Sequence, residues 1–171
     1  FGRNNETVLP IYLGFDPDEA LAEEILEEKE EIFGENVAEE SQLVPGVTAW
    51  LERAQNLQFP QVIASSAPMA NITTILDRFS LGSYFSHLVS GAMLPAKPEP
   101  DVFLQASQKI GFSPRHCVVI EDSVPGVNAA KNAEMRCIAV ATSRNEKALA
   151  SADLVIQDFT FPLDQALNAI L

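Results

Sequence analysis

Two carboxylates stand side by side at the end of an apolar run in the second half of the chain. The stretch HCVVIEDSVPGVNAAK, residues 116–131, carries three aliphatic residues followed at once by Glu121 and Asp122. Adjacent negative charges repel, so each carboxylate disfavours ionisation of the other. A bound cation removes that penalty, and Mg²⁺ takes oxygen ligands while keeping substrate phosphate in its shell. The pair therefore predicts a Mg²⁺ site at the tip of a strand.

Hydroxyl and ammonium groups follow two earlier apolar runs. The run QVIASSA ends in Ser65 and Ser66, and the run HLVSGAMLPAKPEPD leads through a loop to Lys97. Ligands of open α/β sheets bind beyond the carboxyl ends of the strands, so these groups are expected to meet the acid pair. A lysine neutralises phosphoryl oxygens as a point charge. Hydroxyl, ammonium and carboxylates together fit a phosphate held against a divalent metal.

Each of these residues has an ordinary structural explanation when it is taken alone. Ser65 is then a helix cap or turn residue, Lys97 a surface lysine, and the acid pair a cap for the next helix. Their order and spacing favour the site. Lys97 lies 32 residues after Ser65, and Asp122 lies 25 residues after Lys97. Each interval has the length of one strand-and-helix step.

The elements that would position these groups alternate along the chain. Apolar runs and helical patterns follow one another, which is typical of a parallel sheet covered by helices on both faces. The predicted fold class is therefore α/β, with a doubly wound parallel sheet. We expect strands at 61–65, 87–90, 117–121, 137–141 and 154–156, and helices at 69–80, 99–111, 125–134 and 144–150. Pro45 and Gly46 mark a hinge before a further helix.

Residues 1–44 differ from the rest of the chain because they are acidic and helical in pattern. A helix is expected from Asp16, which suits a capping position, with Pro17 in the first turn. Over the whole chain, 24 Asp and Glu face 11 Lys and Arg, for a net charge of -13. Such a charge disfavours nucleic acid and anionic membranes as partners. No apolar run reaches the ~20 residues of a membrane span.

The two cysteines fall in strand-like apolar runs. Cys117 and Cys137 have neither the spacing of a metal site nor the context of a disulfide framework. They are expected to be reduced core thiols, which predicts a cytoplasmic location.

Three motifs give the chain a family resemblance. The stretches VIASSA, KPEPDVF and VIEDSVPGVNAAKNAEM resemble the second, third and fourth motifs of haloacid dehalogenase-like hydrolases. The match is closest to the subfamily that contains β-phosphoglucomutase and many small phosphomonoesterases. The resemblance implies a Rossmann-like core at residues 45–171 and a partial helical cap at residues 1–44.

The resemblance also implies roles for single residues. Ser65 would hydrogen-bond the transferring phosphoryl group. Lys97 would bind that group and offset the charge of the nucleophile. Asp122 would hold Mg²⁺ directly, and Glu121 would hold it directly or through water. In the cap, Arg3 and Asn5 are the candidate substrate contacts, and their pattern favours a phosphatase over a mutase.

One family motif is absent from the sequence. The first core strand should end in an Asp-x-Asp motif whose first aspartate is the nucleophile, and no such strand occurs. Asp16 and Asp18 have the spacing, but Pro17 and the lack of a preceding apolar run mark a helix start. In the family, that strand lies between the strands ending at Ser65 and at Asp122. We therefore expect a slot there, filled by an N-terminal strand that is missing from these residues and belongs to a longer protein.

The expected function is Mg²⁺-dependent hydrolysis of a small phosphorylated metabolite through an aspartyl-phosphate intermediate. A β-phosphoglucomutase-like phosphotransferase is the alternative enzyme. If the protein truly starts at Phe1, it lacks a nucleophile and would only bind metal or phosphate. A receiver-like signalling domain shares the acid pocket, but it lacks the helical segment at 1–44.

Overall fold

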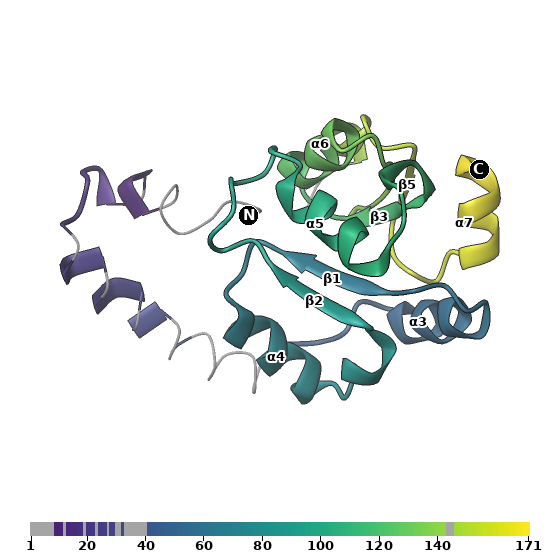
Figure 1. Cartoon of the computed structure of the whole chain (residues 1–171), viewed down its shortest axis with the longest axis horizontal. Helices are drawn as coiled ribbons and strands as arrows, with labels where there is room; N and C mark the ends of the chain where they lie inside the picture. The colour runs from purple at the N-terminus through teal and green to yellow at the C-terminus, as the bar shows by residue number, and fades with distance from the viewer. Residues whose placement is uncertain are drawn as a thin grey trace.

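The computed structural model describes residues 9–11, 13–18, 20–22, 24–26, 28–29, 32, 41–142 and 146–171. From residue 41 onward, strands and helices alternate (Figure 1). In chain order, with 3₁₀ helices labelled η, they are α3 (Val47–Asn56), β1 (Val62–Ser65), α4 (Met69–Arg78), η1 (Gly82–Tyr84), β2 (His87–Ser90), α5 (Asp101–Ile110), η2 (Pro114–His116), β3 (Val118–Glu121), α6 (Val124–Asn132), β4 (Arg136–Val140), η3 (Glu146–Leu149), β5 (Leu154–Ile156) and α7 (Leu163–Ile170). The predicted α/β class and all five predicted strands are confirmed.

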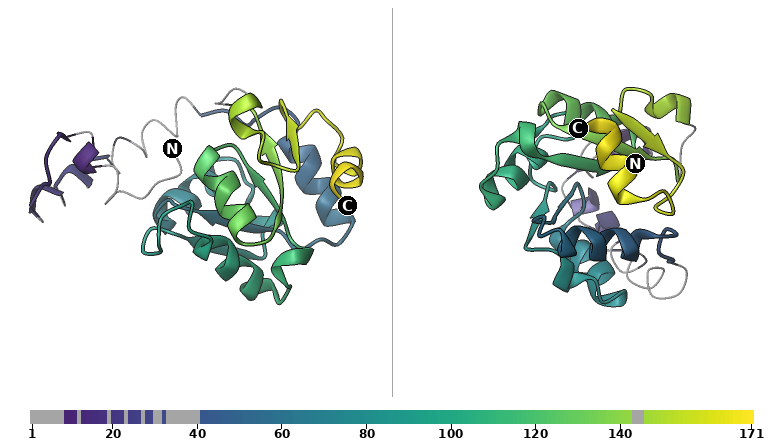
Figure 2. Two further views of the ribbon diagram at one scale, coloured as in Figure 1. Left: turned by 90° about the horizontal axis from the view of Figure 1, so that it is seen from above. Right: turned by 90° about the vertical axis from the view of Figure 1, so that its right-hand side faces the viewer.

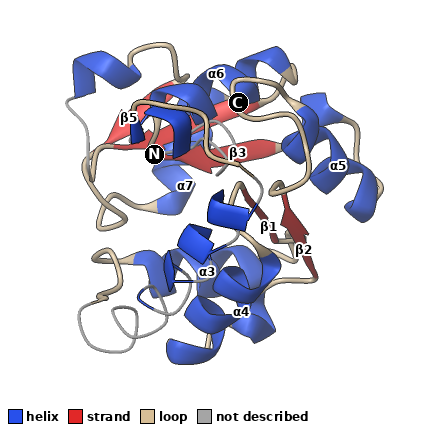
Figure 3. Ribbon diagram, turned by 90° about the vertical axis from the view of Figure 1, so that its left-hand side faces the viewer, coloured by secondary structure: helices blue, strands red, loops and turns tan. Residues whose placement is uncertain are grey.

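The strands form two parallel sheets (Figure 3). β1 pairs with β2, and β4 lies between β3 and β5. Within the described residues, β1 and β3 do not pair with each other. β1 and β3 therefore belong to separate sheets, as a slot between them requires. The width of that slot and the strand that we expect to fill it stay predictions.

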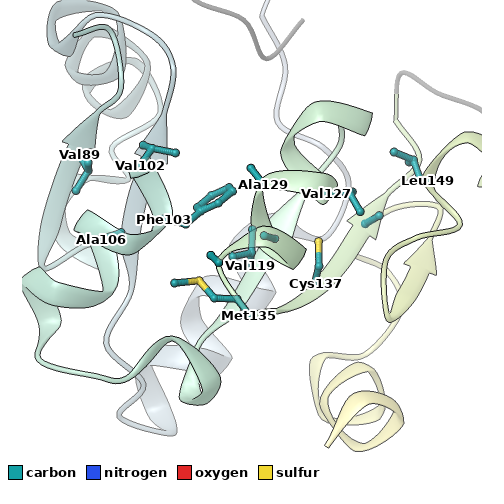
Figure 4. Close-up of a cluster of buried hydrophobic side chains, with 13 residues drawn as sticks. Val89, Val102, Phe103, Ala106, Val119, Val127, Ala129, Met135, Cys137 and Leu149 are labelled. Atoms are coloured by element: carbon teal, nitrogen blue, oxygen red, sulfur yellow. The ribbon is translucent and has the colours of Figure 1, made fainter. Parts of the chain in front are cut away.

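One face of both sheets shares a single hydrophobic cluster (Figure 4). It contains Val89 from β2, Val119 from β3 and Cys137 from β4, with Phe103 from α5 and Val127 from α6. Successive strand residues point to opposite faces, so this face receives every second side chain. The shared cluster joins the two sheets beneath α5 and α6.

The opposite face is divided into two clusters. Trp50 of α3 packs with Ile138 and Val140 of β4 and with residues of α7. α3 and α7 lie beside one another on this side of the three-stranded sheet (Figure 2). Ile72 and Leu76 of α4 belong to a separate cluster against β1 and β2. Each sheet therefore has its own core on this face.

Some predicted elements differ from the structure. The helical stretch expected at 144–150 is present as the 3₁₀ helix η3 (Glu146–Leu149), with residues 144–145 outside the described part of the chain, and α7 was not predicted at all. The N-terminal helix is capped by Asp18 and not by Asp16, because the Leu21 amide donates to Asp18 Oδ1 at 2.9 Å. The division into a cap at 1–44 and a core at 45–171 stays a prediction. None of the helices in the described part of the chain has the length and apolar content of a membrane span.

Candidate active site

A buried ion pair joins the ends of the two sheets. Lys97, in the loop after β2, donates from Nζ to Oε1 of Glu121 at the end of β3. The two side chains are only 5% and 9% exposed. The Lys97 ammonium also lies 4.6 Å from the centre of the Phe103 ring, where a cation is attracted to the ring face. Sequence reasoning brought Lys97 and Glu121 to the same place, and the structure confirms this.

The second oxygen of Glu121 organises the turn into α6. Oε2 accepts hydrogen bonds from the amides of Asp122 and Ser123 and from the Ser123 hydroxyl, each at 2.9 Å. Ser123 Oγ in turn accepts from the Gly126 amide at 3.0 Å and so caps the helix. Both carboxylate oxygens of Glu121 thus have partners within the protein. The metal role expected for Glu121 stays a prediction, whereas its structural role is visible.

These partners also set the protonation of Glu121. Burial alone would raise the pKa of its carboxyl, because the charged form loses water. The charge and hydrogen bond of Lys97 and the hydrogen bonds of Ser123 outweigh burial, and they hold the pKa below its ordinary value of 4.5. Glu121 is therefore a stable carboxylate at neutral pH, matched to the lysine charge.

Gly126 leaves the space that this carboxylate occupies. A Cβ at residue 126 would lie 2.0 Å from Cδ of Glu121 and 2.1 Å from its Oε1. These separations are far inside van der Waals contact. Any side chain at Gly126 would therefore displace Glu121 from Lys97, which explains why a glycine follows Pro125 in this turn.

Ser65 is the last residue of β1, and hydrogen bonds join this strand end to the end of β2 and the loop that follows it. The Ser65 hydroxyl accepts from the Ala67 amide at 3.2 Å, and the Ser65 carbonyl accepts from the Gly91 amide at 2.6 Å. A third hydrogen bond joins the same segments, because Ser90 Oγ donates to the Ala67 carbonyl at 2.7 Å. Ser66 follows directly and begins the turn into α4. The described contacts of Ser65 thus connect it to the β2 loop that leads to Lys97.

Asp122 borders a surface pocket of about 250 Å³. The lining residues are Val44, Ile120, Glu121, Asp122, Val140, Thr142 and Phe159. Sequence reasoning found the two acids and missed the others. Thr142 follows β4 and could have been found by the same strand-end rule, but Val44 and Phe159 come from distant segments that carry no local signal. A second pocket of about 280 Å³ is lined by Ser113, Arg115 and Asn132 among others, and no predicted site residue borders it.

The donor set at the β3 tip can be compared with the needs of Mg²⁺. Among the described residues, no group of three or more His, Cys, Asp or Glu side chains is placed to hold a metal. Mg²⁺ commonly binds through one or two carboxylates, with water and substrate phosphate as its other ligands. Asp122, next to the Glu121 that pairs with Lys97, fits that mode. Arg3 and Asn5, the expected substrate contacts, lie outside the described residues.

Known proteins resemble this chain in sequence. Residues 9–134 match the family described as haloacid dehalogenase-like hydrolase. The chain is 36% identical over 143 residues to Protein SUPPRESSOR OF QUENCHING 1, chloroplastic, of Arabidopsis thaliana, covering 81% of this chain and 13% of that protein. It is 34% identical over 127 residues to Hexitol phosphatase B of Escherichia coli, covering 72% and 57%.

A solved structure shows the same likeness in three dimensions. The family IA, variant 3 hydrolase of the haloacid dehalogenase type from Entamoeba histolytica superposes with a TM-score of 0.87 at 25% identity. The match covers 99% of this chain and 79% of that one. The chain spans less than two thirds of the length of the curated relatives compared above.

Proposed function

Because the chain belongs to the haloacid dehalogenase-like hydrolase family, we propose that the protein is a Mg²⁺-dependent hydrolase of phosphomonoesters. The observation that carries the proposal is the buried Lys97–Glu121 pair, held beside Asp122 at the strand ends. The relatives support a small phosphorylated metabolite as the substrate, since one is named a hexitol phosphatase and another a phosphorylated carbohydrates phosphatase.

The residues of this chain would act mainly by holding charged and hydrogen-bonding groups against the phosphoryl group and Mg²⁺. Lys97 is fixed by Glu121 and is proposed to bind the phosphoryl oxygens, where its ammonium offsets negative charge as the ester bond breaks. The Ser65 hydroxyl is proposed to donate a hydrogen bond to a further phosphoryl oxygen. Ser66, the next residue, is proposed to contribute to the same phosphate-binding loop. Asp122 is assigned the direct contact with Mg²⁺, and Glu121 supports it through the turn at Ser123. Bound Mg²⁺ would supply a Lewis acid for the phosphoryl oxygens.

The nucleophile is proposed to come from a strand that pairs with the open edges of β1 and β3. Parallel strands lie ~4.8 Å apart, so one strand fits between two edges about 10 Å apart. An aspartate at its carboxyl end would meet the strand ends that carry Ser65 and Asp122. Its carboxylate would bond to phosphorus as the bond to the ester oxygen breaks, and the second aspartate of the Asp-x-Asp motif would give the leaving oxygen a proton, so that it departs as an alcohol. Water would then attack the phosphorus of the aspartyl phosphate, release inorganic phosphate and restore the carboxylate.

The test is Asp122→Asn in the full-length protein, assayed with a panel of small phosphate esters and varied Mg²⁺. Loss of the carboxylate is expected to lower kcat/KM by at least about 100-fold, with the fold retained, because a metal contact is removed. Asp77→Asn is the matched control, since Asp77 is an exposed carboxylate near the end of α4 and does not line the Asp122 pocket. Unchanged turnover by Asp122→Asn at limiting Mg²⁺ would rule out its role as a ligand.

We also propose a cytoplasmic location and no partnership with nucleic acid or anionic membranes. Cys117 and Cys137 are both free thiols, which supports a reducing compartment such as the cytoplasm. The net charge of -13 supports the exclusion of nucleic acid and anionic membranes as partners.

A further inference from the structure

The segment that follows β5, around Phe159, packs against the turn at Pro45 and Gly46 that leads into α3. The Phe159 amide donates to the Pro45 carbonyl at 3.0 Å. Gly46 adopts a positive φ of 84° beside it, and a Cβ there would lie 2.3 Å from the Phe159 carbonyl carbon. Backbone therefore packs directly on backbone, which only glycine permits at this position.

Side chains strengthen the same contact one helical turn later. Trp50 is buried and donates from Nε1 to the Phe161 carbonyl at 2.7 Å. Its ring meets the Phe159 ring edge-on, with centres 5.1 Å apart and an interplanar angle of 71°. Arg53 then pairs with Asp164 at 3.1 Å. Residues separated by about a hundred positions in the sequence are thereby held in one arrangement.

The same contact brings two residues to the pocket of the acid pair. The pocket that contains Asp122 is lined by Phe159 and by Val44, which directly precedes Pro45. Ile120 and Val140 supply the other apolar lining. The exposed Asp122 carboxylate thus shares its pocket with an aliphatic and aromatic wall, and Phe159 is the one aromatic residue among those that line it in the described structure.

We propose that Phe159 is a positioning residue for the metal site, through the apolar wall that it gives to the Asp122 pocket. This inference rests on the proposed function, because it takes Asp122 as the Mg²⁺ ligand. An apolar shell limits the access of water to a metal site and lowers the local dielectric constant. Both effects strengthen the attraction between a carboxylate and a cation. Removal of the ring admits water beside the carboxylate and weakens metal binding.

The experiment compares Mg²⁺ binding by four variants of the full-length protein, measured by isothermal titration calorimetry with Mg²⁺ alone. Phe159→Ala removes the ring but keeps the backbone bond to Pro45, and it is expected to raise the Kd for Mg²⁺ by about tenfold, at the low end for changes around a metal site. Phe159→Leu keeps an apolar wall and should remain within about threefold of the parent protein. The Mg²⁺ dependence of kcat/KM should shift in the same order.

Two further variants separate the explanations. Trp50→Phe keeps aromatic packing on Phe159 but loses the bond to Phe161, so it should lower Tm without changing the Kd for Mg²⁺. A folded Phe159→Ala protein with the parental Kd would overturn the inference, and so would a Trp50→Phe protein that binds as weakly as Phe159→Ala. The fourth variant, Asp122→Asn, tests the premise. If it binds Mg²⁺ as the parent does, the proposed metal site is wrong. If it alone loses binding, the proposed function stands and the role of Phe159 fails.

Discussion

The two sheets differ in how fully their strands are buried. In β4, four of the five residues are buried, because strands lie on both sides and helices on both faces. In β1, all four residues are only partly buried, and one edge has no partner within the described chain. The same contrast appears between neighbours on the edge strand β3 and the central β4. Ile120 is 42% exposed, whereas the facing Ile138 is 0% exposed.

This difference follows from what packs against each sheet. One face of each sheet packs on the shared cluster beneath α5 and α6, and the opposite face packs on a separate cluster, that of Trp50 for the three-stranded sheet and that of Ile72 for the two-stranded sheet. A two-stranded sheet is marginal by itself and needs such packing. The site residues are distributed across both sheets, so its geometry depends on what joins them.

The largest effect is expected from breaking the ion pair that joins the sheets. Lys97→Met leaves the Glu121 charge buried without its partner, which typically costs about 3–5 kcal/mol. The measurement is the free energy of unfolding in urea. Lys109→Met, on the exposed end of α5, is the control and should cost less than about 1 kcal/mol. If the two variants are equally stable, the pair does not join the sheets energetically.

A matched pair of substitutions compares the two sheets directly. Ile138→Ala creates a cavity in a fully buried strand and should cost about 4 kcal/mol, near the upper range for such changes. Ile63→Ala in β1 should cost about 2 kcal/mol, because that side chain is only partly buried. Urea unfolding of this chain provides both values. Equal losses would show that β1 is as well packed as β4 and would remove the contrast.

Acid should weaken the junction through Glu121. Its pKa is lower in the folded protein than its ordinary value of 4.5, so its contribution to stability is complete above that value. The contribution is lost as the pH falls below 4.5 and through the depressed pKa. The parent protein should therefore lose stability more steeply than Glu121→Gln between about pH 5 and pH 3. Asp153 and Asp158 also have depressed pKa values and remain in both proteins, so the difference isolates Glu121. Parallel curves would contradict the assignment.

The smallest effect is expected for an ion pair of the same type on the surface. Arg115 and Glu134 lie 2.8 Å apart, but their side chains are 76% and 66% exposed. Water and salt screen such a pair, so Arg115→Ala should change the free energy of unfolding by less than about 1 kcal/mol. A loss close to that of Lys97→Met would show that burial does not decide the strength of these contacts.

The sequence predicted the strands and the Lys97–Glu121 contact because both follow from local patterns and from parallel topology. Apolar runs locate strands, and strand ends of a parallel sheet converge. The surroundings of Asp122 were missed for the opposite reason. Phe159 and Val44 reach the same pocket from segments that are distant in the sequence, and no local periodicity predicts such an arrangement. The stretch at 144–150 was predicted only as helical, and its 3₁₀ form was not predicted, because a short stretch fits either type of helix.

The buried thiol of Cys137 can report on opening of the fold through its chemical reactivity. It lies at the second position of β4 with 0% exposure, and burial together with the charges of Glu121 and Asp153 raises the pKa of its thiol to about 12. A thiol must be both ionised and reachable to react. The rate at which a thiol reagent labels Cys137 is therefore limited by how often the three-stranded sheet opens. Cys117, which is half-buried before β3, should be labelled faster in the same molecule. The labelling rates of the two thiols would therefore measure local opening at the β3 edge and at the central strand β4 separately.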